Sequence, residues 1–139
     1  VAKTDVTLCT DLRYLRRILR NLLDNALKFS ERGTISLSLI TSDDAVAISV
    51  ADTGRGMAPA QQARVFEPYV RLPGARPAPG HGLGLAIVKQ LADVLQIPLV
   101  LHSQPGEGSR FTLTLPRSAS PPDLSTDGTS VPGIGTLHA

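Results

Sequence analysis

The sequence predicts an α+β fold in which a sheet packs on helices as a two-layer sandwich. Segments of alternating apolar residues come largely in hairpins, and two long stretches with helical periodicity do not alternate strictly with them. A doubly wound parallel sheet would need that strict alternation, so the two-layer arrangement is favoured. The 139 residues suffice for one domain with a real core, without room for a second enzyme module.

The first half of the chain predicts a short strand over residues 6–9 and then a long helix. Thr10 or Asp11 can cap that helix, which runs to about Ser30. Its inward face carries apolar residues at helical spacing, namely Leu15, Ile18, Leu19, Leu22, Ala26 and Phe29. Alternating apolar residues over 35–50, interrupted by the polar turn Ser42-Asp43-Asp44, predict a β-hairpin with one buried face.

The second half predicts a short helix that begins at Pro59 and a proline- and glycine-rich loop over 68–81. A second long amphipathic helix follows over 83–95. The final hairpin pairs two apolar stretches, 98–102 and 111–115. Beyond Pro116 the chain is rich in Ser, Thr, Pro and Gly, so we expect one domain over 1–116 and a flexible tail over 117–139.

Composition and charge exclude several classes of protein. The formal net charge is +2, the basic residues are scattered in sequence, and there are few aromatic residues, so nucleic acid is not an expected partner. No apolar run approaches the roughly 20 residues of a bilayer span, so this domain should make no direct membrane contact. The single cysteine, Cys9, is expected to be a small core residue. Together these features favour the cytoplasm, on a parent protein that can be anchored in the inner membrane.

Four short blocks carry the functional pattern. They are NLLDNALK at 21–28, DTGRGM at 52–57, FEP at 66–68 and GHGLGL at 80–85. The last block is the most specific, because its glycines lead directly into an amphipathic helix. In this order the four blocks are typical of a magnesium-nucleotide pocket.

These blocks resemble the N, G1, F and G2 boxes of the ATP-binding domain of bacterial sensor histidine kinases. Such domains belong to the superfamily of gyrase, Hsp90, histidine kinase and MutL ATPases, and the resemblance covers about residues 6–116. It implies the two-layer Bergerat fold, with a mixed sheet packed on helices. It also implies that the loop over 68–81 is a mobile lid over ATP.

The first block supplies polar groups on one helix. Asn21, Asn25 and Lys28 lie four and three residues apart, so they share the strip beside the apolar face. Magnesium prefers hard oxygen ligands. The resemblance implies that the side-chain oxygen of Asn25 meets the metal, that Lys28 approaches the phosphates, and that Phe29 packs near the adenine and ribose.

The second block follows the end of a predicted strand. Asp52 precedes a turn in which Gly54 and Gly56 let the backbone approach a flat ligand. A carboxylate there can accept a hydrogen bond from the exocyclic amine of adenine, which guanine lacks at that position. The resemblance gives Asp52 this role and places Met57 in the same pocket.

The G2 block opens a helix, whose free backbone amides and positive dipole end favour phosphate. The resemblance implies nucleotide contacts by its residues, which are Gly80, His81, Gly82, Leu83, Gly84 and Leu85. His81 departs from the Ser or Thr that relatives often carry, and either donates a hydrogen bond or faces solvent. The resemblance also implies nucleotide contacts by Phe66 and Thr112, and a phosphate contact by Arg71. Phe66 can also anchor the core at the root of the loop.

Asn21 decides between two chemistries. Hydrolysing members of the superfamily carry a glutamate at this position, and an amide cannot act as a general base at neutral pH. We therefore expect ATP and Mg²⁺ as cofactors and phosphoryl transfer to a protein nucleophile. The catalytic candidates are Asn21, Asn25, Lys28 and Arg71.

The phosphate acceptor is expected outside this chain, because none of His81, His102 and His138 lies in the setting of a phosphorylated histidine. The expected partner is a dimerisation domain of the same or a partner chain, with a response regulator downstream. The isolated domain should be a monomer that binds MgATP without phosphorylating itself. Two alternatives stay open: a serine protein kinase of the anti-sigma-factor type, and a non-catalytic nucleotide- or partner-binding module.

Overall fold

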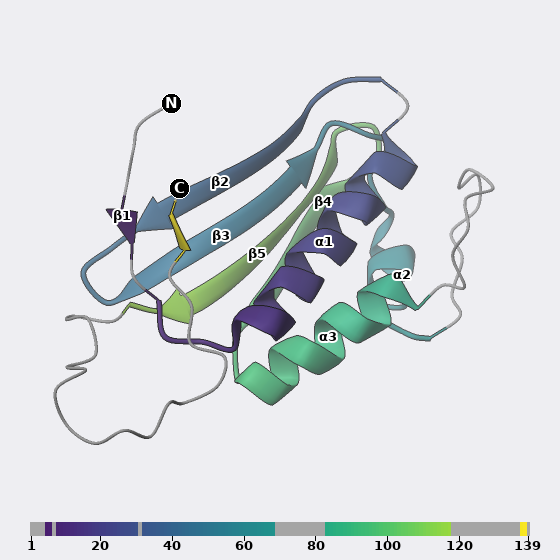
Figure 1. Cartoon of the computed structure of the whole chain (residues 1–139). Helices are drawn as coiled ribbons and strands as arrows, with labels where there is room; N and C mark the ends of the chain where they lie inside the picture. The colour runs from purple at the N-terminus through teal and green to yellow at the C-terminus, as the bar shows by residue number, and fades with distance from the viewer. Residues whose placement is uncertain (1–4, 7, 31, 69–82, 118–136, 139) are drawn as a thin grey trace, which may run out of the picture.

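A four-stranded sheet forms one layer of the molecule, and helices cover one of its faces (Figure 1). The computed structural model describes residues 5–6, 8–30, 32–68, 83–117 and 137–138. The strands are β2 (Ile35–Thr41), β3 (Ala45–Asp52), β4 (Leu99–Gln104) and β5 (Gly108–Pro116). Their spatial order is β2-β3-β5-β4.

The sheet is antiparallel at every pairing among the described strands, so the expectation of a mixed sheet is wrong for this part of the chain. Tight turns join β2 to β3 and β4 to β5, which makes each of these pairs antiparallel. The two hairpins then join through β3 and β5, whose register pairs Asp52 with Ser109 and Val50 with Phe111. The predicted two-layer α+β fold is confirmed.

The sheet has two different faces because side chains alternate along each strand. Toward the helices, β3 presents Val46, Ile48 and Val50, while β5 presents Phe111, Leu113 and Leu115, and all six are buried. The opposite face carries small and polar residues such as Ser49 and Thr112, whose hydroxyl oxygens lie 3.0 Å apart. The core therefore lies between the sheet and the helices.

Helix α1 (Leu12–Phe29) packs on the sheet through Leu15, Ile18, Leu22 and Ala26, as the periodicity predicts. Asp11 is its N-cap. The Asp11 carboxylate accepts a hydrogen bond from the backbone N–H of Arg13 (3.0 Å) and two from the Arg13 guanidinium (3.3 and 3.0 Å). These bonds, chiefly those from the guanidinium, hold the pKa of Asp11 below its ordinary value of 3.8.

Two further helices complete this layer. Helix α2 (Pro59–Gln62) is one short turn that begins at a proline, and α3 (Gly84–Leu95) packs against α1. Gln96 ends α3 in the left-handed conformation, with φ of 56°. The backbone N–H of Ile97 then bonds to the carbonyl of Ala92, which turns the chain into β4.

The ends of the described chain lie close together. β1 (Asp5–Val6) pairs with β6 (Leu137–His138) in a separate two-stranded sheet, and Leu8 forms a bridge with Arg117. Leu8 is buried, whereas the neighbouring Cys9 is exposed, so the expectation that Cys9 is a core residue is wrong. Successive side chains of an extended segment point in opposite directions, and Leu8 takes the inward position.

Most of the predicted tail lies outside the described residues, as does the predicted lid beyond Pro68. The division into a domain and a tail therefore stays a prediction. Among the helices that the structure describes, none has the length and apolar character needed to span a membrane.

Candidate functional site

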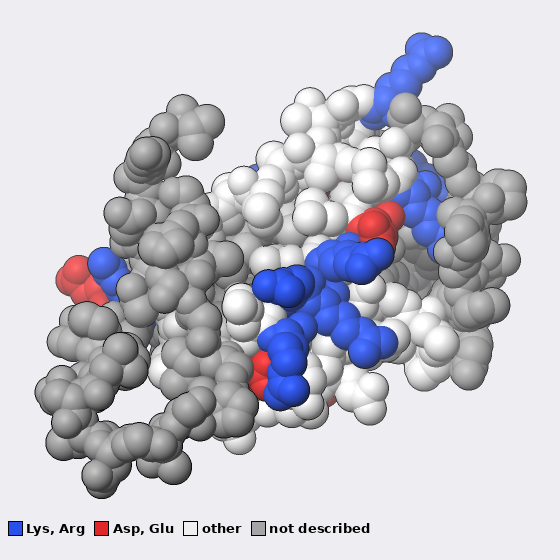
Figure 2. Space-filling view, in the orientation of Figure 1, with Lys and Arg blue, Asp and Glu red and all other residues white. Residues whose placement is uncertain are grey.

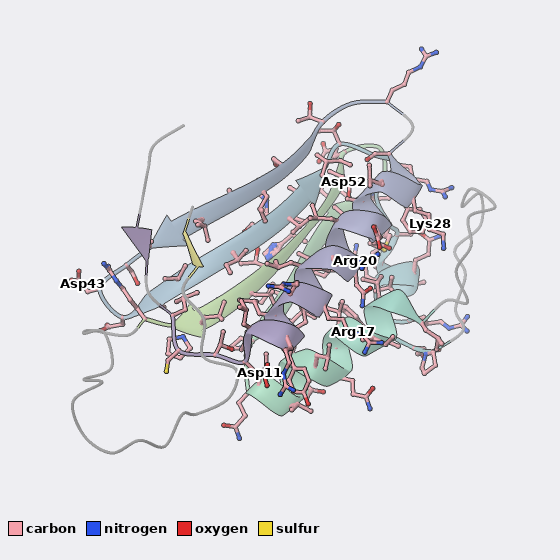
Figure 3. The ribbon with its side chains drawn as sticks, in the orientation of Figure 1. Asp11, Arg17, Arg20, Lys28, Asp43 and Asp52 are labelled. Atoms are coloured by element: carbon pink, nitrogen blue, oxygen red, sulfur yellow. The ribbon has the colours of Figure 1, made fainter. Side chains whose placement is uncertain are left out.

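The C-terminal half of α1 presents the predicted N-box residues along one flank. Asn21, Asn25 and Lys28 are each partly exposed, beside the buried Leu22 and Ala26. Lys28 also lies in the last turn of the helix, where a cation is favoured by the helix dipole. Figure 3 shows Lys28 and Asp52 at the same end of the molecule, one from α1 and the other from the end of β3.

Asn21 carries an unsatisfied donor. Its side-chain nitrogen, Nδ2, is buried and has no hydrogen-bond partner in the described structure. A buried donor without an acceptor costs about 1–3 kcal/mol, so such an atom calls for a ligand acceptor. A phosphate oxygen would satisfy it. The oxygen of Asn25, one helical turn later, is the hard donor that magnesium prefers, so this amide pair fits a magnesium-phosphate group.

The G1 segment brings a buried carboxylate to the end of α1. Asp52 is 7% exposed, and its Oδ1 accepts a hydrogen bond from the backbone N–H of Gly54 at 2.9 Å. A Cβ on Gly54 would lie 2.8 Å from Asp52 Oδ1 and would collide with the carbonyl oxygen of Phe29. The turn therefore touches the last residue of the helix, and only glycine allows this approach.

The end of α1 contributes two further features. The guanidinium of Arg55 lies over the Phe29 ring, 5.2 Å from its centroid, which ties the G1 segment to the helix. The hydroxyl oxygen of Ser30 is buried without a partner in the described structure, and it lies 3.0 Å from the position of a Cβ on Gly54. Neither Arg55 nor Ser30 was among the predicted site residues.

The hairpin between β4 and β5 holds the G1 segment from its other side. Gly56 has φ of +68°, and a Cβ there would collide with the carbonyl of Gln104. The Ser103 hydroxyl accepts a hydrogen bond from the backbone N–H of Met57 (2.8 Å) and lies 2.8 Å from the Ser109 hydroxyl. Ser103 also contacts the Gly108 carbonyl at 3.0 Å. Met57 itself is buried, so its backbone depends on this contact.

Ser103 was not predicted, although the sequence carries a signal for it. Leu99 and Leu101 point toward the core, and alternation places Ser103 on the same face at the end of the strand. A serine at that inward position needs hydrogen-bond partners, and the G1 segment supplies one. What could not be read from the strand alone is which loop lies against it.

Phe66 lies at the root of the predicted lid and is partly buried. Its ring packs edge-on against Phe111, with centroids 6.1 Å apart and an interplanar angle of 83°. In the G2 block, Leu83 is partly buried, Gly84 is exposed at the start of α3, and Leu85 is buried. Three G2 residues, Gly80, His81 and Gly82, lie outside the described residues together with Arg71.

Thr112 lies on the other side of the sheet from the predicted site residues of α1. Its neighbours Phe111 and Leu113 face the helices, so Thr112 faces the opposite side of the sheet, where its hydroxyl meets that of Ser49. A cavity of about 360 Å³ opens at the hairpin end of the sheet. Its lining includes Asp52 and Ser103 as well as Ala51 and His102, so it reaches the G1 segment. Its lining, as far as the structure describes it, contains no residue of α1.

The fold and this arrangement define a class of protein. Residues 10–119 match the model of the histidine kinase-, DNA gyrase B- and HSP90-like ATPase family, and the chain belongs to that family. Within it, the chain is an ATP-binding catalytic domain of the sensor histidine kinase type, as its relatives show.

Among these relatives, the sensor histidine kinase AtsR of Burkholderia thailandensis is 33% identical over 99% of this chain and 24% of its own length. The alginate biosynthesis sensor protein KinB of Pseudomonas aeruginosa is 40% identical, over 76% of this chain and 18% of its own length. The chain thus spans a quarter or less of the length of these two proteins.

Solved structures show the same fold. Full-length ShkA in complex with AMPPNP has a TM-score of 0.66 and 37% identity, over 77% of this chain and 22% of that one. The mycobacterial sensor histidine kinase MprB has a TM-score of 0.67 and 34% identity, over 76% of this chain and 73% of that one.

Proposed function

We propose that this domain binds MgATP and donates the γ-phosphate to a histidine on a separate dimerisation domain, in two-component signal transduction. The observation that carries the proposal is the meeting of Asp52 with the end of α1. A buried carboxylate lies there beside a helix flank that holds an unsatisfied amide donor, a second amide and a lysine. ShkA, which has the same fold, was crystallised with the nucleotide AMPPNP.

Recognition of adenine is assigned to Asp52. One carboxylate oxygen is occupied by the Gly54 N–H, and no described residue donates a hydrogen bond to the other, Oδ2. Oδ2 is thus available to accept a hydrogen bond from the exocyclic amine of adenine. Guanine presents a carbonyl oxygen at that position, so this contact would select ATP over GTP. We assign Phe29, Met57 and Phe66 to the apolar surface of the same pocket.

The phosphates are assigned to the flank of α1. Asn21 Nδ2 would donate to a phosphate oxygen, the Asn25 oxygen would hold magnesium, and Lys28 would neutralise charge on the phosphates. Bound magnesium would supply electrostatic stabilisation of the transferring phosphoryl group. Since Asn21 cannot accept a proton from water as a glutamate does, the site lacks a general base for hydrolysis at this position. Donation to a protein nucleophile is therefore favoured.

The proposal extends to the partners and the location, and the relatives support the partners. These are sensor kinases much longer than this chain, so we assign the acceptor histidine to another domain of the parent protein or of its partner, with a response regulator as the next acceptor. The serine-kinase alternative is disfavoured because the named relatives are histidine kinases and sensor proteins. The domain would act in the cytoplasm.

Calorimetric titration tests nucleotide binding. Wild-type protein should bind ATP and ADP with magnesium and should bind GTP at least tenfold more weakly. Asp52→Asn should lose most of the preference for adenine, and Asn25→Ala should lose the effect of magnesium on ATP affinity. Asp43→Asn and Gln90→Ala are matched controls, because both residues are exposed and lie outside the four blocks. Absence of ATP binding by the wild type would favour a non-catalytic module.

Phosphotransfer needs a second assay. Labelled ATP is mixed with this chain and a candidate dimerisation domain, and the product is tested for acid-labile, alkali-stable phosphate. We expect labelled phosphohistidine on the added domain and none on this chain. Phosphoserine on the added protein would instead support the anti-sigma-type kinase, and label on the isolated chain would contradict the proposed division of roles.

A further inference from the structure

Four arginines gather on the solvent face of α1. Arg13, Arg16, Arg17 and Arg20 are all exposed, and we call them the arginine patch. Figure 2 shows Lys and Arg side chains concentrated over the middle of the helical layer, and Figure 3 places Arg17 and Arg20 on α1 there. The basic residues therefore look scattered in the sequence, but the helix brings four of them onto one surface.

Most of the patch is unpaired within the described structure. Arg13 forms an ion pair with Asp11, at 3.0 Å between Nη2 and Oδ2. The remaining three, Arg16, Arg17 and Arg20, form no ion pair with any described residue. Other exposed basic residues do form ion pairs with acidic residues: Lys89 pairs with Asp93 at 2.7 Å, and Arg64 pairs with Glu67 at 3.4 Å.

The spacing of the patch is unfavourable for the helix itself. Arg16 and Arg20 are four residues apart and Arg17 and Arg20 are three apart, so like charges face each other on adjacent turns. The carboxylate at this end of the helix, that of the N-cap Asp11, is already occupied by Arg13. An anionic partner would relieve the repulsion.

We propose that the arginine patch is a docking surface for an acidic protein surface, one that presents several carboxylates to one face of α1. This inference does not depend on the proposed function, because none of the four arginines is assigned to the nucleotide and the test below uses no nucleotide. Arg13 provides an example of a carboxylate bound by an arginine of this patch. Its guanidinium binds both carboxylate oxygens of Asp11, and planar guanidinium groups match carboxylates in this way.

The geometry favours a protein over the other polyanions. The patch spans eight residues of helix, roughly 10 Å from Arg13 to Arg20. Among the described residues, an aromatic ring beside it is that of Tyr14, which Arg13 already covers at 5.8 Å. A nucleic-acid surface usually extends further and offers free aromatic platforms. A membrane-binding helix inserts apolar side chains, but the apolar face of α1 is buried in the core, through Leu15, Ile18 and Leu22.

Fluorescence anisotropy with a fluorescein-labelled decaglutamate peptide tests the proposal at low salt, without nucleotide. The patch variant carries Arg16→Gln, Arg17→Gln and Arg20→Gln. Its control carries Arg32→Gln, Arg64→Gln and Lys89→Gln, three exposed residues elsewhere whose loss changes the net charge equally. Each of the three arginines would form one exposed ion pair with a peptide carboxylate, and the loss of three such pairs lowers the affinity by about tenfold in total. The patch variant should therefore bind the peptide about tenfold more weakly than wild type. The control variant should change the affinity by less than about threefold, and raising the salt concentration should weaken wild-type binding.

Three outcomes would overturn the proposal. In the first, wild-type protein does not bind the peptide. In the second, the patch and control variants lose affinity equally, which would show that only net charge matters. In the third, duplex DNA or phosphatidylglycerol vesicles bind more tightly than the peptide with the same dependence on the patch, which would reassign the surface to phosphate-bearing polymers or lipids. Circular dichroism of both variants establishes that they are folded.

Discussion

Gly56 of the G1 segment and Gly106 of the β4–β5 turn allow two destabilising effects to be measured separately: an unfavourable backbone conformation and a steric collision. Gly56 and Gly106 both have positive φ, of +68° and +81°. A Cβ on Gly106 would meet nothing within 4 Å, whereas one on Gly56 would collide with the Gln104 carbonyl. An L-residue in this conformation costs about 1–2 kcal/mol by itself.

Gly106→Ala is therefore expected to lower the free energy of unfolding by about 1 kcal/mol, and Gly56→Ala by clearly more. Chemical denaturation measures both. Gly56→Ala should also weaken ATP binding, because the collision displaces the G1 segment that carries Asp52. Equal losses of stability in the two variants would show that the hairpin does not hold the G1 segment as described.

Ser103 provides a second residue-level test of the same contact. Ser103→Ala leaves the N–H of Met57 without its acceptor, which should cost about 1–3 kcal/mol of unfolding free energy. ATP affinity should fall as well. Ser38→Ala, at an exposed strand position, is the control and should be close to neutral. Stability unchanged in Ser103→Ala would mean that another group or water replaces the hydroxyl.

At the scale of elements, α1 depends on its N-cap. Asp11→Ala should lower the denaturation midpoint, while Asp11→Asn should retain the cap at neutral pH, because an amide oxygen also accepts the Arg13 N–H. The folded-state pKa of Asp11 is lowered by Arg13. Its contribution to stability is therefore present at pH values above the unfolded pKa, near 4, and is lost as the pH falls through the lowered folded pKa.

Denaturation of wild type and Asp11→Asn across pH 2 to 7 measures this linkage. The difference in stability between the two proteins should shrink at the acidic end of that range, because Asp11 becomes protonated and resembles an amide. A constant difference across the whole range would exclude a role for the ionised carboxylate.

The arginine patch makes a separate prediction for α1. Arg17→Glu replaces the repulsion of Arg20 by an attraction three residues away. We expect the free energy of unfolding to rise by about 0.5 kcal/mol at low salt and by less at high salt. A destabilised variant would mean that Arg17 has a structural partner. The same change should weaken binding of the acidic peptide, so stability and docking would move in opposite directions.

At the scale of the whole molecule, nucleotide should stabilise the folded state through linkage. ATP with magnesium at about 100 times its dissociation constant should add roughly 2.7 kcal/mol to the free energy of unfolding. Thermal denaturation with ATP, ADP and GTP measures this. Asp52→Asn should abolish most of the gain, and Asp43→Asn should retain it. Equal stabilisation by GTP would contradict adenine recognition by Asp52.

Much of the fold could be predicted from periodicity. The inward face of α1, the β2–β3 hairpin and the start of α3 agree with the spacing of apolar residues, because each element buries a face that its own sequence defines. The predictions of a buried Cys9 and of a mixed sheet were wrong for the described residues. Local pattern does not decide which side chain of a short extended segment turns inward, or how two hairpins join.

For the site, the blocks pointed to Asp52 and to the flank of α1. The structure shows that the G1 segment meets the end of that helix. The roles in nucleotide binding stay predictions. Thr112 shows the limit of motif reasoning, because the β3–β5 register turns its hydroxyl toward Ser49. Ser103 shows the converse, since its partner is 46 residues away in sequence.

The sequence by itself determined the four blocks that carry the family resemblance, the helix and strand periods, and the amide at position 21, since each is a property of residue types at fixed spacing. Only the tertiary structure decided that the β4–β5 hairpin holds the G1 segment, that Thr112 faces away from the helices, and that four arginines share one surface. The physical reason is that these features depend on register and on contacts between segments far apart in the chain. Such contacts exist only once the hydrophobic core has brought those segments together.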